Sequence, residues 1–254
     1  AGTNIAAEYA ARSRDYGNLV FTADFATLAA NPHLFPKLAY NAEQDFVPIS
    51  LLARFPLLLV VNNELPVRSF QEFAAWARAN PDKLSYGSPG LGTPHHLATE
   101  LLAQKMGVKM THAPYRGAGP AMLDVIGGQT PFMLVDSAAG LPHINTGKVR
   151  AIGVASAQRL KSLPRTPTLI EQGVAGFEAF AWQGLVAPRG TDDATIQMWS
   201  RTLQETLKTP AVQARFEALA LEPLPSTPEQ MREFWLSEKK RWGEVIKTAG
   251  IKLD

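Results

Sequence analysis

The 254-residue chain contains no cysteine, which excludes disulfide bonds and thiol chemistry and is compatible with an oxidising compartment. No apolar run approaches the ~20 residues that a membrane-spanning helix needs. Charged residues make up 19% of the chain and nearly cancel at a formal net charge of +2. The sequence therefore has neither the excess of positive charge that binding nucleic acid needs nor an acidic tail. Nucleic acid is not expected as a partner.

Two well-known glycine-rich motifs are also absent from the sequence. A Walker-type phosphate loop needs Lys followed by Ser or Thr after its last glycine, but Gly92 is followed by Thr93 and Pro94. A serine-hydrolase elbow needs glycine two places before its serine, and Tyr86 stands there relative to Ser88. The sequence therefore supports neither nucleotide hydrolysis nor nucleophilic catalysis.

The most informative segment that is present is residues 86–97, YGSPGLGTPHHL, which joins a short strand to a helix through glycines and small hydroxyl residues. Glycines let the backbone approach a ligand closely, and the first amides of a helix lack intrahelical acceptors, so they can donate to a carboxylate or phosphate. An ordinary strand-to-helix turn is the alternative interpretation. The segment predicts a cradle for a small anion.

Helical and strand patterns alternate along most of the chain. Helices are expected over 4–13, 70–79 with Ser69 as cap, 94–106, 119–126, 137–146, 192–208 with Thr191 as cap, and from Pro228 with Thr227 as cap. Strands are expected over 18–22, 46–62, 84–87, 108–113, 131–135, 149–155 and 179–188. This alternation predicts an α/β fold with a parallel or mixed sheet, in one large or two modest domains.

The last helix carries apolar residues at spacings of three and four. These residues are Phe234, Trp235, Trp242 and Ile246. Such spacing is typical of a helix face that packs on a core rather than of a binding stripe. We therefore expect core packing from them and no chemistry.

Three loops follow three strands between residues 84 and 137, namely Ser88–Thr93, Tyr115–Gly117 and Asp136–Ala138. Ligands of open α/β sheets lie at the carboxyl ends of strands, so the three loops are expected to meet at one site. The alternatives are that Tyr115 only covers the sheet, that Arg116 is a solvated surface charge and that Asp136 only caps the next helix.

The order and spacing of many short motifs resemble one family, the substrate-binding proteins of tripartite tricarboxylate transporters, or Bug-type receptors. The matching segments are 31–35, 46–53, 86–97, 114–121, 127–129, 141–144, 147–151, 163–164, 167–168, 171–173 and 187–188, with Trp182, Gly184 and Trp242. Together these motifs cover nearly the whole chain.

The resemblance implies a periplasmic, monomeric solute receptor with a two-lobe periplasmic binding protein fold of type II-like topology. Residues 1–54 plus 184–254 would form lobe 1 and residues 55–183 lobe 2, joined by two crossover strands. The ligand would be a small carboxylate, such as a di- or tricarboxylate, an amino acid or an aromatic acid, handed to membrane transporter subunits. No cofactor is implied.

The sequence departs from the family pattern at two places. Family members carry a strand, a loop rich in proline and glycine, and a helix ahead of the helix matching Gly2–Ile5, so lobe 1 is expected to lack this segment and to hold ligand poorly without it. Residues 22–27, TADFAT, which include the acidic Asp24, stand where the family more often has small and hydroxyl residues. An acidic side chain there would repel an anionic ligand if it faced the cleft.

The residues expected to bind the ligand come from both lobes. They are Ser88, Gly90, Gly92, Thr93, His95, Tyr115, Arg116, Asp136 and Ser137 in lobe 2, with Thr22 and Thr27 facing them from lobe 1. The loop donors would hold one carboxylate, Asp136 and Ser137 would orient the rest of the ligand, and Arg116 is the candidate cation. One helix N-terminus stabilises an anion by only about 0.3 to 1 kcal/mol, so several donors are needed.

Two other classes of function stay open at this point. An enzyme acting on a small acid would use His95, His96, Asp136 and Ser88, although no motif places a base beside a nucleophile. A sensor subunit would present the same fold to a signalling receptor. Metal binding is not expected, because His33, His112 and His143 lack ligand spacing and His95 and His96 point differently on a helix.

Overall fold

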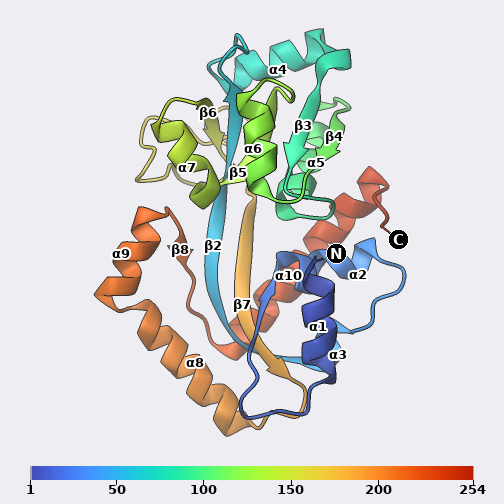
Figure 1. Cartoon of the computed structure of the whole chain (residues 1–254), viewed down its shortest axis with the longest axis vertical. Coiled ribbons are helices and arrows are strands. Elements are labelled where there is room, and N and C mark those ends of the chain that lie inside the picture. The colour runs from blue at the N-terminus through green and yellow to red at the C-terminus, as the bar shows by residue number, and fades with distance from the viewer. Residues whose placement is uncertain (1, 254) are drawn as a thin grey trace. The chain divides into compact units, whose positions relative to one another are not determined.

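A computed structural model describes residues 2–253 (Figure 1). The chain divides into two compact units, each with its own strands and helices. Unit 1 comprises the chain up to Arg54, Trp182–Ala218 and the chain from Glu222 onward, and unit 2 comprises Phe55–Ala181 and Leu219–Leu221. Within the described range, no helix combines the length and the apolar character needed to cross a membrane.

Unit 1 contains a sheet of strand order β1–β7–β2–β8, to which β2 contributes its first part. Its strands are β1 (Phe21–Asp24), β2 (Phe46–Asn62), β7 (Phe180–Pro188) and β8 (Glu222–Pro223). Its helices are α1 (Gly2–Arg12), η1 (Ala26–Ala30), α2 (Asn31–Leu34), α3 (Ala42–Asp45), α8 (Asp193–Leu207), α9 (Pro210–Ala218) and α10 (Pro228–Ala249). β1 runs antiparallel to β7, and β8 runs antiparallel to β2.

The long helix α10 supplies much of the core of unit 1. Its capping box is confirmed, since Thr227 and Gln230 bond each other's backbone amides. Trp235, Trp242 and Ile246 are buried as predicted, and Trp235 Nε1 donates to the carbonyl of Leu28. The apolar face of α10 therefore packs inward, as the spacing of its residues indicated.

One buried carboxylate organises this core. Glu238 Oε2 accepts from the indole Nε1 of Trp182 at 3.1 Å and from that of Trp242 at 3.0 Å. Arg241 Nη1 lies 3.4 Å from the other oxygen, Oε1. Phe25 packs edge-on against both tryptophan rings. Buried indole N–H groups need acceptors, and a single side chain supplies one to both.

Unit 2 contains a mixed sheet of strand order β6–β2–β5–β3–β4, to which β2 contributes its second part. Its other strands are β3 (Ser85–Ser88), β4 (Thr111–Pro114), β5 (Phe132–Asp136) and β6 (Val149–Val154). Its helices are α4 (Phe70–Ala79), η2 (Pro81–Lys83), α5 (Pro94–Met106), α6 (Ala118–Ile126) and α7 (Ser137–Asn145). β3 is parallel to β4 and β5, whereas β2 is antiparallel to β5 and β6, which confirms the predicted mixed sheet.

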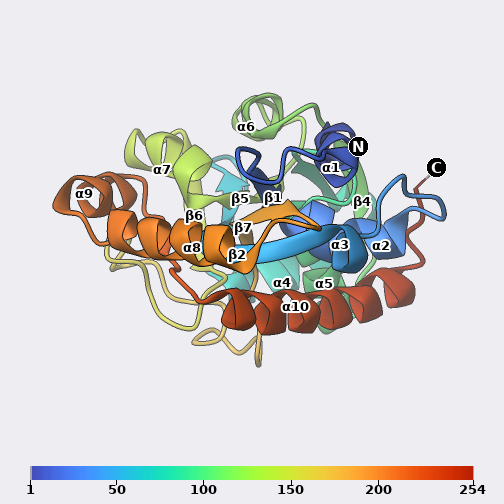
Figure 2. The same ribbon diagram turned by 90° about the horizontal axis from the view of Figure 1, so that it is seen from below.

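Helices cover both faces of the unit 2 sheet. Figures 1 and 2 show α6 and α7 on one face and α4 and α5 on the other. Leu58, Val60, Met133 and Val135 are among the fully buried side chains of the core that includes α6. This two-sided cover leaves the ends of the parallel strands as the positions where polar loops can gather.

Several predicted boundaries shift in the structure. The first strand was expected over 18–22, but β1 begins at Phe21, because Asn18 bonds Asp15 in a turn. Thr191 was expected to cap α8, but Asp192 is the cap and Thr191 donates its hydroxyl to Pro188 instead. Helix α9 was not predicted from the sequence.

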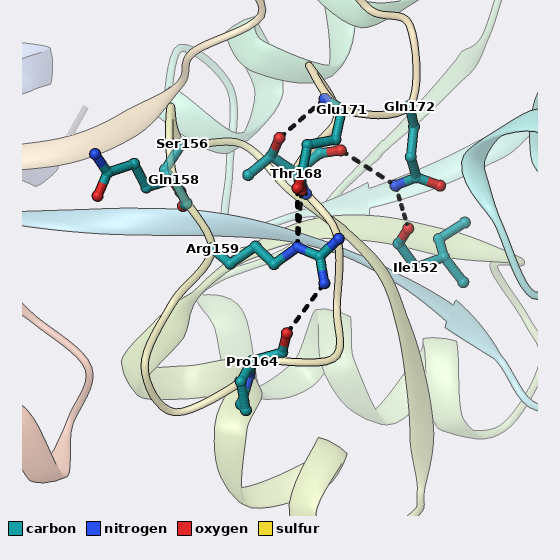
Figure 3. A network of polar contacts seen from close by, with 8 residues as sticks. All are labelled: Ile152, Ser156, Gln158, Arg159, Pro164, Thr168, Glu171 and Gln172. Atoms are coloured by element: carbon teal, nitrogen blue, oxygen red, sulfur yellow. Dashed lines mark hydrogen bonds and ion pairs between the residues drawn. The ribbon is translucent and has the colours of Figure 1, made fainter.

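The irregular segment after β6 is held by a polar network (Figure 3). Arg159 Nε lies 3.0 Å from both carboxylate oxygens of Glu171, and its Nη1 donates to the carbonyl of Pro164. Glu171 and Thr168 bond each other's backbone amides, while Gln172 Nε2 donates to Ile152. Thr168, Glu171 and Gln172 are among the motif residues of the sequence, and in the structure they serve to shape this loop.

Candidate functional site

The structure brings the three predicted loops of unit 2 to one edge of its sheet. β3, β4 and β5 are parallel neighbours, with Ser88 opposite Pro114 and Gly87 opposite Met133. The amide of Tyr115 donates to the carbonyl of Ser88 at 2.9 Å, and that of Gly117 donates to Pro89 at 3.0 Å. The first two loops are therefore tied together by backbone bonds.

Two glycines shape the loop between β3 and α5. Gly90 has φ +149° and Gly92 has φ +74°, backbone conformations that side-chain-bearing residues rarely adopt. The amide of Gly92 donates to Nδ1 of His96 at 3.1 Å. A backbone amide can only donate, so Nδ1 of His96 carries no proton and its ring proton lies on Nε2.

The loop hydroxyls already have partners inside the loop. Ser88 is fully buried, and its Oγ lies 3.1 Å from the carbonyl of Gly90 and 2.6 Å from Nε2 of His112. Thr93 Oγ1 donates to the same carbonyl at 2.8 Å and accepts from the amide of His96 as the cap of α5. A hydroxyl has one proton to donate, so both of these side chains organise the loop rather than offer a free donor.

Backbone amides are the donors that the loop leaves available. Within residues 2–253, the amides of Leu91 and His95 have no hydrogen-bond acceptor. Leu91 is 49% exposed at the tip of the loop, and His95 lies in the first turn of α5. Free amides at this position favour an anionic group, as the sequence pattern indicated.

Three stacked rings lie next to the loop. The Tyr86 and His112 ring centroids are 4.8 Å apart, and those of His112 and His96 are 4.0 Å apart with planes only 9° from parallel. Burial lowers the pKa of His96 to about 3, with a contribution from His112, and burial also lowers the pKa of His112 to about 4. Both imidazoles are therefore uncharged at neutral pH.

Sequence reasoning missed His112. The structure does place a base beside a hydroxyl, because His112 Nε2 contacts Ser88 Oγ. The parallel register of β3 and β4 accounts for this contact. Tyr86 pairs with His112, and Ser88 pairs with Pro114, two residues further along each strand. The Ser88 hydroxyl is already bonded within the loop, to His112 and near the carbonyl of Gly90, so the pair supports the loop.

His95 and Asp136 join the first turns of two helices. His95 Nε2 lies 3.3 Å from Oδ2 of Asp136, while Oδ1 of Asp136 accepts from the amide of Ala139 as the cap of α7. Burial alone would raise the pKa of Asp136, but the bonds from His95 and from the Ala139 amide outweigh it, and the pKa is lowered. Asp136 is therefore an ionised cap as well as a partner of His95.

The remaining predicted residues of unit 2 differ in whether their polar groups already have partners within the protein. Tyr115 donates its hydroxyl to Asp124 at 2.7 Å, and its ring packs beside Gly87 and the sheet core. Ser137 is fully buried and donates to the carbonyl of Ala220 at 2.8 Å. Arg116 is exposed and, among the described residues, forms no ion pair. The structure therefore leaves both interpretations of Arg116 open, a surface charge and a cation for the ligand.

The two predicted residues of unit 1 flank Asp24. Thr22 is exposed on β1 opposite Leu185. Thr27 is fully buried, and both its amide and its hydroxyl donate to Oδ1 of Asp24 at 2.8 Å. The carboxylate of Asp24 therefore closes the turn after β1, which gives this acidic residue a structural role.

A metal site is not found among residues 2–253, where no three His, Asp or Glu side chains gather in a way that could hold an ion. His95 faces Asp136, whereas His96 stacks on His112. These two adjacent histidines therefore point to different partners, as helical spacing predicted.

Comparison with known proteins identifies the fold. Residues 1–251 match the family model described as tripartite tricarboxylate transporter family receptor. The chain is 34% identical to protein BugT of Bordetella pertussis over 252 residues, which are 99% of this chain and 76% of BugT. It covers 65% to 68% of the length of three further curated relatives.

Two solved structures are closely similar to this chain. Rpa4515 of R. palustris with adipate superposes with a TM-score of 0.91 at 32% identity, covering 98% of this chain and 83% of that one. The periplasmic binding protein BugD superposes with a TM-score of 0.89 at 30% identity, covering 99% and 85%. The predicted α/β periplasmic binding protein fold is thus confirmed, and the family consists of binding proteins rather than enzymes. The chain belongs to the tripartite tricarboxylate transporter receptor family.

Proposed function

We propose that this protein captures a small carboxylate in the periplasm and delivers it to the membrane subunits of a tripartite tricarboxylate transporter. The observation that carries the proposal is the loop between β3 and α5, whose Leu91 and His95 amides are free to receive an anion. Adipate in the similar Rpa4515 structure supports a carboxylate as the ligand class. Di- and tricarboxylates, amino acids and aromatic acids all contain the required group.

The binding energy has to come from several donors. Micromolar affinity corresponds to about 8 kcal/mol, whereas one hydrogen bond to a charged group contributes roughly 1.5 to 3 kcal/mol. The free amides of Leu91 and His95 therefore need support from further groups. We propose that the second lobe supplies them, from the region of Thr22 and Thr27, when the two lobes close on the ligand.

We also propose that the chain forms two lobes, residues 1–54 plus 184–254 and residues 55–183, joined by two crossover strands. The residues predicted from the sequence to bind the ligand are proposed to do so. The protein is further proposed to act as a monomer that hands its ligand to transporter subunits. The match to the family model supports these proposals.

Replacing Thr93 by alanine is expected to weaken carboxylate binding about tenfold, which corresponds to about 1.4 kcal/mol. The substitution removes the cap of α5 and the bond to the carbonyl of Gly90, so the loop amides lose their fixed direction. Ser88→Ala should weaken binding through the same loop. Isothermal titration calorimetry of the full-length protein with adipate, succinate and malate provides the measurement.

The control for both variants is Ser162→Ala, which removes an exposed hydroxyl from the same unit. It should bind as the unmodified protein does. If Thr93→Ala and Ser88→Ala also bind unchanged, the loop is not part of the site. If none of a broad panel of carboxylates binds to the full-length protein, the proposed function itself is wrong.

A further inference from the structure

His95 holds an unused polar atom at the candidate site. His95 is 7% exposed, and its Nδ1 is buried without any hydrogen-bond partner among the described residues. Only one other side-chain atom in residues 2–253, Thr130 Oγ1, is buried in this state. A buried polar atom without a partner is unfavourable, so a hydrogen-bonding group from another molecule would stabilise it.

The chemistry of this free atom follows from the partner of the other ring nitrogen. The ionised carboxylate of Asp136 can only accept, so a His95 ring with a single N–H proton carries that proton on Nε2, which faces Asp136 at 3.3 Å. Nδ1 of that ring then carries a lone pair and no proton. It is an acceptor that matches a donor on another molecule.

The position of the ring points to the ligand that would supply this donor. His95 lies in the first turn of α5, and its partner Asp136 caps α7, so the ring bridges two helix N-termini. The free amides of Leu91 and His95 lie on the same loop and helix turn. A ligand held by these amides through a carboxylate would therefore have its neighbouring atoms near the acceptor.

We propose that Nδ1 of His95 selects carboxylic acids that carry a hydroxyl beside the carboxylate over the same acids without it. This inference rests on the proposed carboxylate-binding function and narrows its ligand class. A hydroxyl on the ligand would donate to Nδ1, whereas an acid without it would leave the acceptor buried and unpaired. Sites built to bond a polar group discriminate strongly against analogues that lack it.

The test compares matched pairs of acids at pH 8, with malate against succinate and 2-hydroxyadipate against adipate, by calorimetric titration. The full-length protein should bind the hydroxylated member of at least one pair about tenfold more tightly. His95→Gln keeps an N–H that can reach Asp136 but has no acceptor at the Nδ1 position, so the preference should fall to within about threefold. His95→Asn can place its carbonyl oxygen near the Nδ1 position and should retain the preference.

The outcomes separate the inference from the proposed function. His143→Gln, at a histidine elsewhere in unit 2, is the control and should keep the preference of the unmodified protein. Equal affinity for both members of each pair, or a preference that survives in a folded His95→Gln variant, would overturn the inference while the receptor function stands. Absence of binding for all four acids would count against both. The folding of each variant is checked by circular dichroism.

Discussion

Replacing Glu238 by leucine is expected to lower the free energy of unfolding of unit 1 by about 3 kcal/mol, the scale seen when one partner of a buried charged group is removed. The substitution deprives the indole N–H groups of Trp182 and Trp242 of their shared acceptor. Both rings are fully buried, so water cannot replace the carboxylate without rearrangement of the core. The loss outweighs the gain from no longer burying a charge.

The measurement is urea unfolding followed by tryptophan fluorescence. Four of the five tryptophans lie in unit 1, so the signal reports mainly on this unit. Glu238→Gln retains a carbonyl oxygen as acceptor and should cost clearly less than Glu238→Leu. Glu244→Leu, at an exposed position of the same helix, is the matched control and should change the stability by no more than about 0.5 kcal/mol. Equal effects of Glu238→Leu and Glu244→Leu would contradict the prediction.

Unit 2 is expected to lose about 2 to 3 kcal/mol of stability when the pH falls from 7 to 5. The ordinary histidine pKa is 6.5, whereas the folded pKa is about 3 for His96 and about 4 for His112. Between pH 6.5 and about 4 the unfolded chain therefore binds more protons than the folded chain, so stability falls as the pH falls. At pH 5 the deeply buried His96 accounts for about 2 kcal/mol, and the more exposed His112 adds less.

Urea unfolding at pH 7 and pH 5, followed by circular dichroism, measures this loss. His112→Phe keeps an aromatic ring in the stack but cannot take up a proton, and His96→Asn can still offer an oxygen to the amide of Gly92. Both variants should lose less stability than the unmodified protein over this pH range. His143→Gln should behave like the unmodified protein. A pH dependence that is the same in all four proteins would show that the stack is not responsible.

The sequence predicted the fold well because its signals are local. Gly107 ends α5 in the left-handed conformation, and Thr227 with Gln230 starts α10, as their residue types indicated. The errors are also local, since Thr191 and Asp192 are both good caps and only the structure decides between them. The start of β1 was misplaced because Asn18 serves the preceding turn.

The site was harder to predict because its contacts depend on strand register. Nothing in the sequence places His112 beside Ser88, or stacks it between Tyr86 and His96, until β3 and β4 are aligned. The sequence correctly marked Thr93 and Asp136 as polar positions at strand ends, but it could not show that Thr93 binds its own loop or that Asp136 faces His95. Long-range pairing decides which hydroxyls and amides are left free.

The double role of Asp136 limits how this receptor can diversify. The same carboxylate starts α7 and fixes the orientation of His95, so a substitution that alters recognition at this residue also weakens a helix. Leu91, in contrast, is half exposed at a loop tip. We therefore expect evolution to tolerate changes at position 91 more readily than changes at position 136, because Asp136 both caps α7 and contacts His95.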